Sequence, residues 1–208
     1  MNIKSLILLP IAALLFSACD NPADKTIKAT VREAVEVNSS SSVQGEKYVL
    51  TNNSEILFVG SKVTGSHKGG FKRFAGAFTM ADNALVGSGQ RIVIDMNSLW
   101  TDTEKLTAHL KSEDFFNVAK YPQASFELTK LKSVATGQFE VAGNLTLHGS
   151  TKNITFPASA SLADGKAEVH AKFNINRKDF GIIYAGKTDD LIRNEVVLEL
   201  KIEAAPEA

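Results

Sequence analysis

Histidine, cysteine and acidic side chains are the groups in this sequence that could bind a metal ion or transfer protons. The four histidines are His67, His109, His148 and His170. None of them stands in an HxH or HExxH spacing, the patterns that bring two imidazoles to one zinc ion. We therefore predict no metal site, and we expect His109 to cap or orient a short helix.

Two common catalytic motifs are absent from the sequence, which contains neither a GxSxG elbow for a nucleophilic serine nor a GxGxxG loop after a strand. Asp95, Asp102, Asp114 and Asp179 could in principle pair as acid and base, but their spacing does not indicate different environments. We interpret Asp95 and Asp179 as strand-end and turn residues. The sequence therefore predicts no catalytic residue and no cofactor.

Cys19, the single cysteine, follows a stretch with the layout of a secretory signal. Lys4 is positively charged, residues 6–16 form an apolar run, and Ser17 and Ala18 are small. As a helix the run spans about 16 Å, well short of the roughly 30 Å of hydrocarbon in a bilayer. The letters FSAC resemble a lipobox, in which a peptidase cleaves before a cysteine that carries lipid.

We therefore predict a lipoprotein of the cell envelope, with a signal peptide over residues 1–18 and lipid attached to Cys19. It would be membrane-anchored and face the periplasm. A lone cysteine has no partner for an internal disulfide, which fits a thiol already joined to lipid. The alternative is an ordinary signal peptide with a chance cysteine, because Phe16 stands where a lipobox usually has leucine.

The composition is that of a globular protein. Lysine and arginine number 23 together, as do aspartate and glutamate, and hydrophobic residues make up 44% of the chain. Such a balance is typical of a folded domain. Because there is no basic excess to bind a phosphate backbone, we predict no nucleic-acid partner.

Hydrophobic and polar residues alternate along most of the chain between Tyr48 and Ala204. Alternation gives a strand one dry and one wet face, as in antiparallel sheets. Turn signals such as Asp164-Gly165 separate the runs. The pattern predicts eight strands, over residues 55–62, 73–80, 90–96, 124–131, 139–147, 154–162, 167–175 and 196–202.

Eight antiparallel strands favour an all-β, lipocalin-like barrel over a sandwich, because closure removes sheet edges and leaves room for one small ligand. Leu106, His109 and Leu110 are spaced as on a helix, so we expect one or two short helices within residues 102–119.

The domain boundaries follow from these patterns. After the signal peptide we predict a flexible tether over residues 19–45, the barrel over 46–204 and a C-terminal tail over 205–208. The tether has little apolar periodicity and contains four consecutive serines, although residues 26–37 could form a short strand or helix. As a coil it would span about 28 Å.

Several motifs resemble the YceI family of lipid-binding envelope proteins. In the family's order they are HLKSEDFFNV and KYPQASF within residues 109–126, GNLTLHGSTK at 143–152, and NRKDFGI at 176–182. The resemblance covers about 155 residues. It implies a barrel with an apolar cavity that binds a polyprenyl quinone or isoprenyl phosphate without catalysis.

The side chains that would form this cavity are mostly phenylalanines, which need no hydrogen-bond partner. The same rings could instead fill the barrel. From alternation we assign to the cavity Phe58, Phe78, Phe126, Phe139, Leu145, Phe156 and Phe173, and we expect Phe115, Phe116 and Phe180 to close one end.

Basic residues near loop ends, Arg73, Arg177 and Lys178, are candidates for contact with a ligand head group. Two other functions stay open at this point. One is an enzyme that acts on a lipid substrate inside the barrel, and the other is a filled barrel that serves as a stress-related interaction module.

Overall fold

The computed structural model describes residues 21–37, 44–82 and 84–207. The predicted signal peptide and Cys19 lie outside these residues. The strands are β1 (Ile27–Lys28), β2 (Thr30–Glu33), β3 (Glu46–Leu50), β4 (Glu55–Lys62), β5 (Gly65–Phe71), β6 (Phe74–Ala81), β7 (Ala84–Asp95), β8 (Leu99–Thr101), β9 (Gln123–Ala135), β10 (Gln138–Leu147), β11 (Ser150–Ala163), β12 (Lys166–Asn176), β13 (Gly186–Lys187), β14 (Asp190–Leu191) and β15 (Glu195–Pro206). The helices are α1 (Glu104–Lys111) and the 3-10 helices η1 (Pro22–Lys25), η2 (Met96–Ser98) and η3 (Arg177–Phe180).

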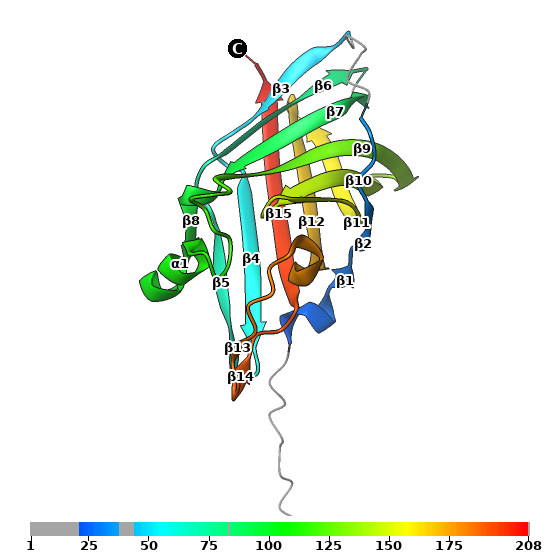
Figure 1. Ribbon diagram of the computed structural model, residues 1–208. Coiled ribbons are helices and arrows are strands. Elements are labelled where there is room, and N and C mark those ends of the chain that lie inside the picture. The colour runs from blue at the N-terminus through cyan, green and yellow to red at the C-terminus, as the bar shows by residue number, and fades with distance from the viewer. Residues whose placement is uncertain (1–20, 38–43, 83, 208) are drawn as a thin grey trace, which may run out of the picture.

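The strands form a closed antiparallel barrel (Figure 1). Its wall runs in the order β3, β6, β7, β9, β10, β11, β12 and β15, and β15 closes the ring by pairing with β3. Toward one end β4 takes the place of β3 beside β15, and β5 and β8 continue the sheet from β4. The predicted eight-stranded barrel is confirmed.

The strands that the sequence pattern missed are short or lack alternation. β5 reads GSHKGGF, in which glycines, His67 and Lys68 obscure any period of two. β3 and β8 have five and three residues, too few to establish a period.

One α-helix forms within the segment where one or two were expected. The Thr103 side chain caps α1 by accepting a hydrogen bond from the backbone N–H of Leu106, and the Ser112 hydroxyl donates to the carbonyl of His109 at the other end. Phe115 and Phe116 follow in turns instead of a second helix. Among the described residues, no helix is long and apolar enough to cross a membrane.

Strands β11 and β12 pair at one end of the barrel and separate toward the other. Their pairing begins where Ser159 lies opposite His170 and continues to the hairpin. Beyond that point the N-terminal segment fills the gap, which we call the seam. β1 lies parallel to β12, with Ile27 opposite Phe173, and β2 lies antiparallel to β11 (Figure 1). Backbone groups facing the seam are thus paired with a strand of the segment instead of with each other.

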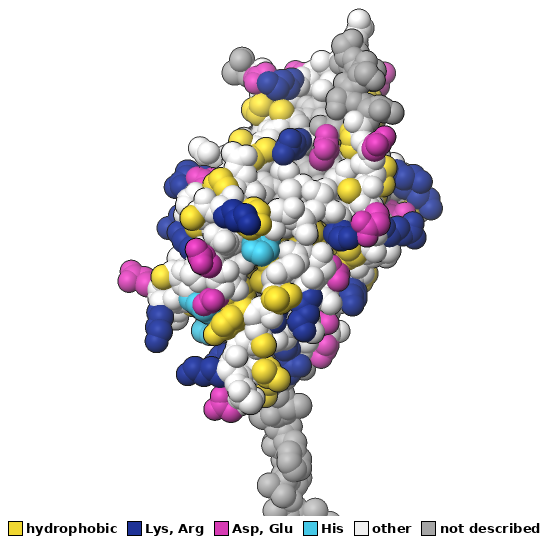
Figure 2. Space-filling model, in the orientation of Figure 1, with side chains coloured by type: hydrophobic (Ala, Val, Ile, Leu, Met, Phe, Trp, Pro, Cys, Tyr) yellow, Lys and Arg dark blue, Asp and Glu magenta, His cyan; other side chains and the backbone are white. Residues whose placement is uncertain are grey.

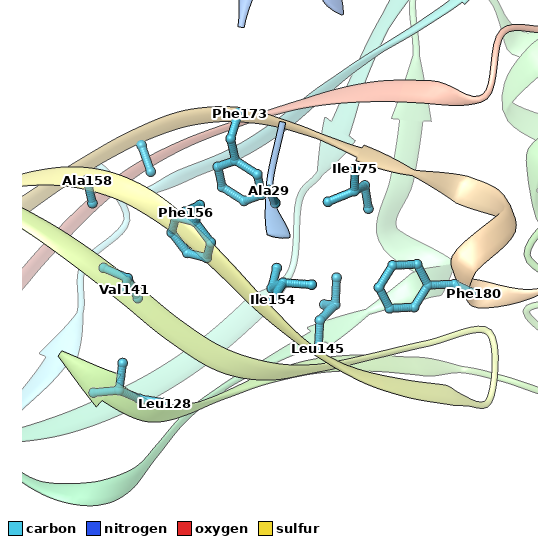
Figure 3. Packing of buried hydrophobic residues seen from close by; sticks show 11 residues of the cluster. Ala29, Leu128, Val141, Leu145, Ile154, Phe156, Ala158, Phe173, Ile175 and Phe180 are labelled. Atoms are coloured by element: carbon cyan, nitrogen blue, oxygen red, sulfur yellow. The ribbon is translucent and has the colours of Figure 1, made fainter. Parts of the chain in front are cut away.

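Ala29 lies between β1 and β2 and is the innermost part of the segment. Its N–H donates to the carbonyl of Asn174 at 2.8 Å, and its side chain is 3% exposed. It belongs to the same apolar cluster as Ile154, Phe156 and Phe173 (Figure 3). The N-terminal segment therefore contributes to the core as well as to the wall.

Two buried asparagines on the outer face of the barrel bind the segment. The Asn174 amide donates to the carbonyls of Ala23 and Thr26, each at 3.2 Å. The Asn144 side chain accepts from the N–H of Val35 at 3.0 Å and donates to its carbonyl at 2.6 Å. Outward-facing strand positions are normally solvated, so their burial follows from the segment that covers them.

Two predicted boundaries are corrected. The flexible tether over residues 19–45 is wrong for residues 21–35, because the partners that order this segment lie on β10, β11 and β12 and leave no local signal. The C-terminal tail over 205–208 is wrong for its first two residues. β15 extends to Pro206, which pairs with Tyr48.

Two inward-facing phenylalanine rings lie against glycines of neighbouring strands. A Cβ atom on Gly69 would stand 2.4 Å from the Phe58 ring, and one on Gly143 would stand 2.2 Å from the Phe126 ring. Real Cβ atoms do not approach so closely, so each ring occupies space that a side chain on the facing strand would need. The glycines allow these rings to stay close to the wall.

Replacing Ala29 with Asp should lower the free energy of unfolding by roughly 3 kcal/mol, since it would bury an unpaired carboxylate in the seam. Ile27→Asp is the matched control on the same segment, because Ile27 is 61% exposed. It should change the value by no more than about 0.5 kcal/mol. Urea unfolding followed by Trp100 fluorescence measures both, and equal effects would contradict the buried position of Ala29.

Replacing Gly143 with Ala should lower the free energy of unfolding by about 1–3 kcal/mol, because the new methyl group would overlap the Phe126 ring. Gly65→Ala is the control, since a Cβ atom there meets nothing within 4 Å. It should be neutral or stabilising by under about 1 kcal/mol. Indistinguishable thermal melting curves for the two variants would refute this account of Gly143.

Candidate ligand-binding cavity

The barrel contains a cavity of about 620 Å³, within the roughly 300–1,000 Å³ typical of small-molecule sites. Most of its wall is apolar, and water gains no hydrogen bonds there, so the wall favours an apolar ligand. Aliphatic side chains on the wall include Ile56, Ile92, Ile94, Val141, Leu147, Ile154, Val169, Ala171, Leu198, Leu200 and Ile202.

Eight of the ten residues assigned to the cavity from the sequence lie on its wall. They are Phe58, Phe78, Phe115, Phe116, Phe126, Leu145, Phe156 and Phe173. Six of them come from β4, β6, β9, β10, β11 and β12, and Phe115 and Phe116 come from the turns after α1. The period of two is a local property of each strand, which explains why alternation alone assigned most of them to the correct face.

Phe139 and Phe180 do not line the cavity, contrary to the prediction. Phe139 stands near the start of β10, on the inner face but beyond the end of the cavity, and packs half-buried against the apolar cluster. Phe180 ends η3, is 0% exposed and points toward Leu145 within that cluster (Figure 3). Both rings support the wall from outside the cavity.

The aromatic rings of the wall pack against one another and leave the centre of the barrel open. Phe156 on β11 and Phe173 on β12 stack across the gap between these strands, with centroids 4.1 Å apart and planes 11° apart. Phe126 lies tilted against Phe156 at 5.7 Å. The alternative in which the phenylalanines fill the barrel is therefore not supported.

At one end the lining changes from apolar to basic, and we call this end the mouth. Basic residues reach it from the end of β4, from β5, α1 and η3, and from the segment of residues 181–194. They are Lys62, His67, Lys105, His109, Arg177, Lys187 and Arg193. Lys105 and Lys187 are exposed, so the mouth is open to solvent. None of the lining residues in the described part of the chain is an aspartate or a glutamate.

Arg177 is the most deeply buried charge at the mouth, at 3% exposure. Its guanidinium donates to three backbone carbonyls, those of Ile182 at 2.6 Å, Arg193 at 3.1 Å and Ile192 at 3.5 Å. Burial lowers its pKa from the ordinary value. No carboxylate of the described residues forms an ion pair with it, although a buried charge usually has a partner of opposite sign.

Two other mouth residues are already paired. Lys62 forms an ion pair with Asp190, which also accepts hydrogen bonds from Thr64. The His67 ring lies 2.9 Å from the carboxylate of Asp102. These pairs join β4 and β5 to the segments beside them, and the Lys62–Asp190 pair neutralises a positive charge that would otherwise face a ligand.

A cluster of aromatic rings lies beside the mouth, next to α1. The His109 ring packs edge-on against Phe115 and Tyr184, with centroids 5.2 and 5.0 Å apart. Phe115 and Phe116 both line the cavity here, in keeping with the expectation that they close one end. His109 thus joins α1 to the segment after η3, which fits the expected role of orienting the helix and not that of capping it.

Arg73 and Lys178, the other predicted head-group residues, do not line the cavity. The Arg73 guanidinium is bound to the Asp95 carboxylate at 2.7 and 2.9 Å, and these hydrogen bonds hold the pKa of Asp95 below its usual range. Lys178 follows Arg177 on the short turn of η3, and its side chain is exposed while that of Arg177 is buried. Arg177 alone of the three lies at the cavity.

Another polar candidate from the sequence, His148, has a structural position. His148, at the turn after β10, packs against the Tyr121 ring with centroids 4.8 Å apart. Within residues 21–37, 44–82 and 84–207, no three His, Cys, Asp or Glu side chains are grouped so that they could hold a metal ion.

Sequence reasoning missed most of the basic mouth, because Lys105, Lys187 and Arg193 look like solvated surface residues when each is considered alone. One signal was available, since residues 181–188 read GIIYAGKT and match the GxxxxGK[ST] phosphate-loop spacing. That motif requires a strand before the loop and a helix after it. Here η3 precedes the motif, and its Gly186 and Lys187 form β13 of the β13–β14 hairpin instead of leading into a helix, so the segment is not a phosphate loop, although Lys187 reaches the mouth.

The fold matches solved structures. BcnA of Burkholderia cenocepacia superposes with a TM-score of 0.66 at 19% sequence identity, covering 73% of this chain and 96% of BcnA. A polyisoprenoid-binding domain from Saccharophagus degradans, implicated in plant cell wall breakdown, gives a TM-score of 0.64 at 20% identity, covering 77% of this chain and 98% of that domain. At such identities these matches establish the barrel fold.

Sequence comparison identifies the family of the chain. A UPF0312 protein of Pseudomonas putida (strain W619) is 32% identical over 176 residues, which cover 77% of this chain and 89% of that protein. The YceI-like domain matches residues 48–204, from β3 to β15. The chain therefore belongs to the YceI-like family.

Proposed function

We propose that this protein binds an isoprenoid-type amphiphile, such as a polyprenyl quinone or an isoprenyl phosphate, and sequesters or carries it without chemical change. The observation that carries the proposal is the apolar cavity of about 620 Å³ inside the closed barrel. Burial of a hydrocarbon tail there would contribute about 25 cal/mol for each Å² removed from water. The polyisoprenoid-binding domain with the same fold supports this ligand class.

The two other functions considered from the sequence receive less support. A filled barrel would leave no space for a chain-like ligand, whereas this barrel is hollow. An enzyme inside the barrel needs convergent groups for proton transfer or nucleophilic attack. The wall is apolar, and the titratable groups that line the mouth are lysine, arginine and histidine side chains, with no carboxylate among the lining residues of the described chain to act as acid–base partner.

We further propose that the protein is an envelope lipoprotein, anchored at Cys19 and facing the periplasm. Asn21 is 7% exposed, and η1 beside it is bound to Asn174 on β12, at the same end of the barrel as η3 and the mouth (Figure 1). The two residues from Cys19 to Asn21 extend over at most about 7 Å. An anchor at Cys19 would thus hold the mouth close to the membrane.

Exposed hydrophobic side chains at the mouth end fit this orientation. Ile183, Val63 and Leu191 are 72, 50 and 48% exposed, and they lie on the segment after η3, the β4–β5 turn and β14. In Figure 2 hydrophobic side chains lie among charged ones in the half of the molecule that carries β13 and β14. Apolar side chains among basic ones are typical of surfaces that contact lipid head groups.

Native mass spectrometry after mild extraction tests the binding proposal. We expect a co-purified prenyl lipid, or binding of added prenyl quinone at micromolar concentration. Ala171→Phe should reduce binding at least about tenfold, because Ala171 lines the cavity and a phenyl ring there would occupy tail space. His170→Phe is the control, since the neighbouring His170 is exposed and does not line the cavity. If neither the parent protein nor the control binds any prenyl chain, the carrier function fails.

Anchoring is tested by the intact mass and the location of the mature protein. We expect the protein to start at Cys19 with added diacylglycerol and to fractionate with membranes. Cys19→Ser should abolish the lipid and release the protein from the membrane fraction, while the barrel still binds ligand. A mature protein of unmodified mass would instead indicate an ordinary signal peptide.

A further inference from the structure

We propose that the mouth selects amphiphiles with an anionic head group, a phosphate or a carboxylate, over neutral amphiphiles with the same tail. The inference rests on the proposed function, because it assumes that a tail occupies the cavity. It adds the chemistry of the other end of the ligand and assigns it to Arg177, Arg193, Lys105 and Lys187.

The first argument for an anionic head group is the positive charge at the mouth that no carboxylate of the described residues neutralises. Of the basic residues that line the cavity, Lys62 and His67 have carboxylate partners in Asp190 and Asp102, and His109 has a distant one. Within the described residues, Arg177, Arg193, Lys105 and Lys187 form no ion pair. The residual charge at the mouth is therefore positive.

The Arg177 side chain gives the second argument. A guanidinium carries five N–H donors, and the three carbonyl acceptors around Arg177 do not engage all of them. It is nearly fully buried and also lines the cavity. A buried cation in a low-dielectric site gains most from an anion that can reach it, and its planar fork suits the paired oxygens of phosphate or carboxylate.

Geometry supplies the third argument, because the basic residues lie at one end and the remaining wall is apolar. A single-tailed amphiphile would place its hydrocarbon against Phe126, Phe156 and Phe173 and its head at the mouth. A quinone or alcohol head could accept a hydrogen bond there, but it would leave the positive charge uncompensated. An anionic head accepts hydrogen bonds from the donors at the mouth and also neutralises its positive charge.

The test uses the mature protein in non-ionic detergent, freed of bound lipid, and three probes with the same tail. These are geranylgeranyl monophosphate, geranylgeranoic acid and geranylgeraniol. Dissociation constants are measured at low and high salt. We expect at least one anionic probe to bind about tenfold or more tightly than the alcohol, and this preference to fall in about 0.5 M salt, where screening is strong.

The decisive variant is the triple substitution Lys105→Gln, Lys187→Gln and Arg193→Gln. It should remove most of the preference for the anion and change binding of the alcohol far less, because glutamine loses the charge but still donates hydrogen bonds. Arg177 is kept, because it also holds three carbonyls of the neighbouring segment in place. The control removes the same charge from exposed positions outside the cavity, with Lys28→Gln, Lys130→Gln and Lys132→Gln, and should retain the preference.

The outcomes separate the two proposals. Preference for the phosphate alone or for the acid alone supports the inference and identifies the head group, and equal preference for both shows that charge is sufficient. Equal binding of all three probes would overturn the inference while the carrier function stands, as would a preference that the triple variant retains. If no probe binds, the proposed function itself fails.

Discussion

Backbone pairing of the N-terminal segment with β11 and β12 is the interaction on which the rest of the barrel depends. These two strands must diverge along part of their length, and their facing N–H and C=O groups would then be left without partners. β1 and β2 pair with them, and Ala29 completes the apolar cluster behind them. The wall therefore stays continuous around a cavity without needing side chains to fill it.

The cavity also depends on how the large side chains are placed. Glycines at positions 69 and 143 allow the rings of Phe58 and Phe126 to lie close to the wall, and Phe156 and Phe173 stack on each other. Large residues thus line the barrel without meeting at its centre. An open centre gives these side chains less dispersion attraction than a filled core would, and backbone pairing around the whole circumference offsets that cost.

The sequence predicted what depends on local pattern and missed what depends on distant partners. Alternation on β10 and β12 assigned Leu145 and Phe173 to the cavity, because strand facing has a period of two. The segment around Ala29 has no comparable pattern, since its order comes from Asn144 and Asn174 far along the chain. Most of the mouth was missed for the same reason: Arg177 was predicted, but Lys105 on α1 and Lys187 and Arg193 in the segment before β15 meet it only after folding.

The N-terminal segment also has a consequence for the order of folding. Its partners β11 and β12 lie in the last third of the chain, so the segment leaves the ribosome long before the strands that hold it. Pairing of such widely separated residues is slow, because the loop-closure entropy is lost before the contacts form. Until then Ala29 and the rings of Phe156 and Phe173 would stay exposed to water. The incomplete barrel would also have unpaired strand edges with which other chains could pair. The late step of folding would thus be the docking of the first strands made.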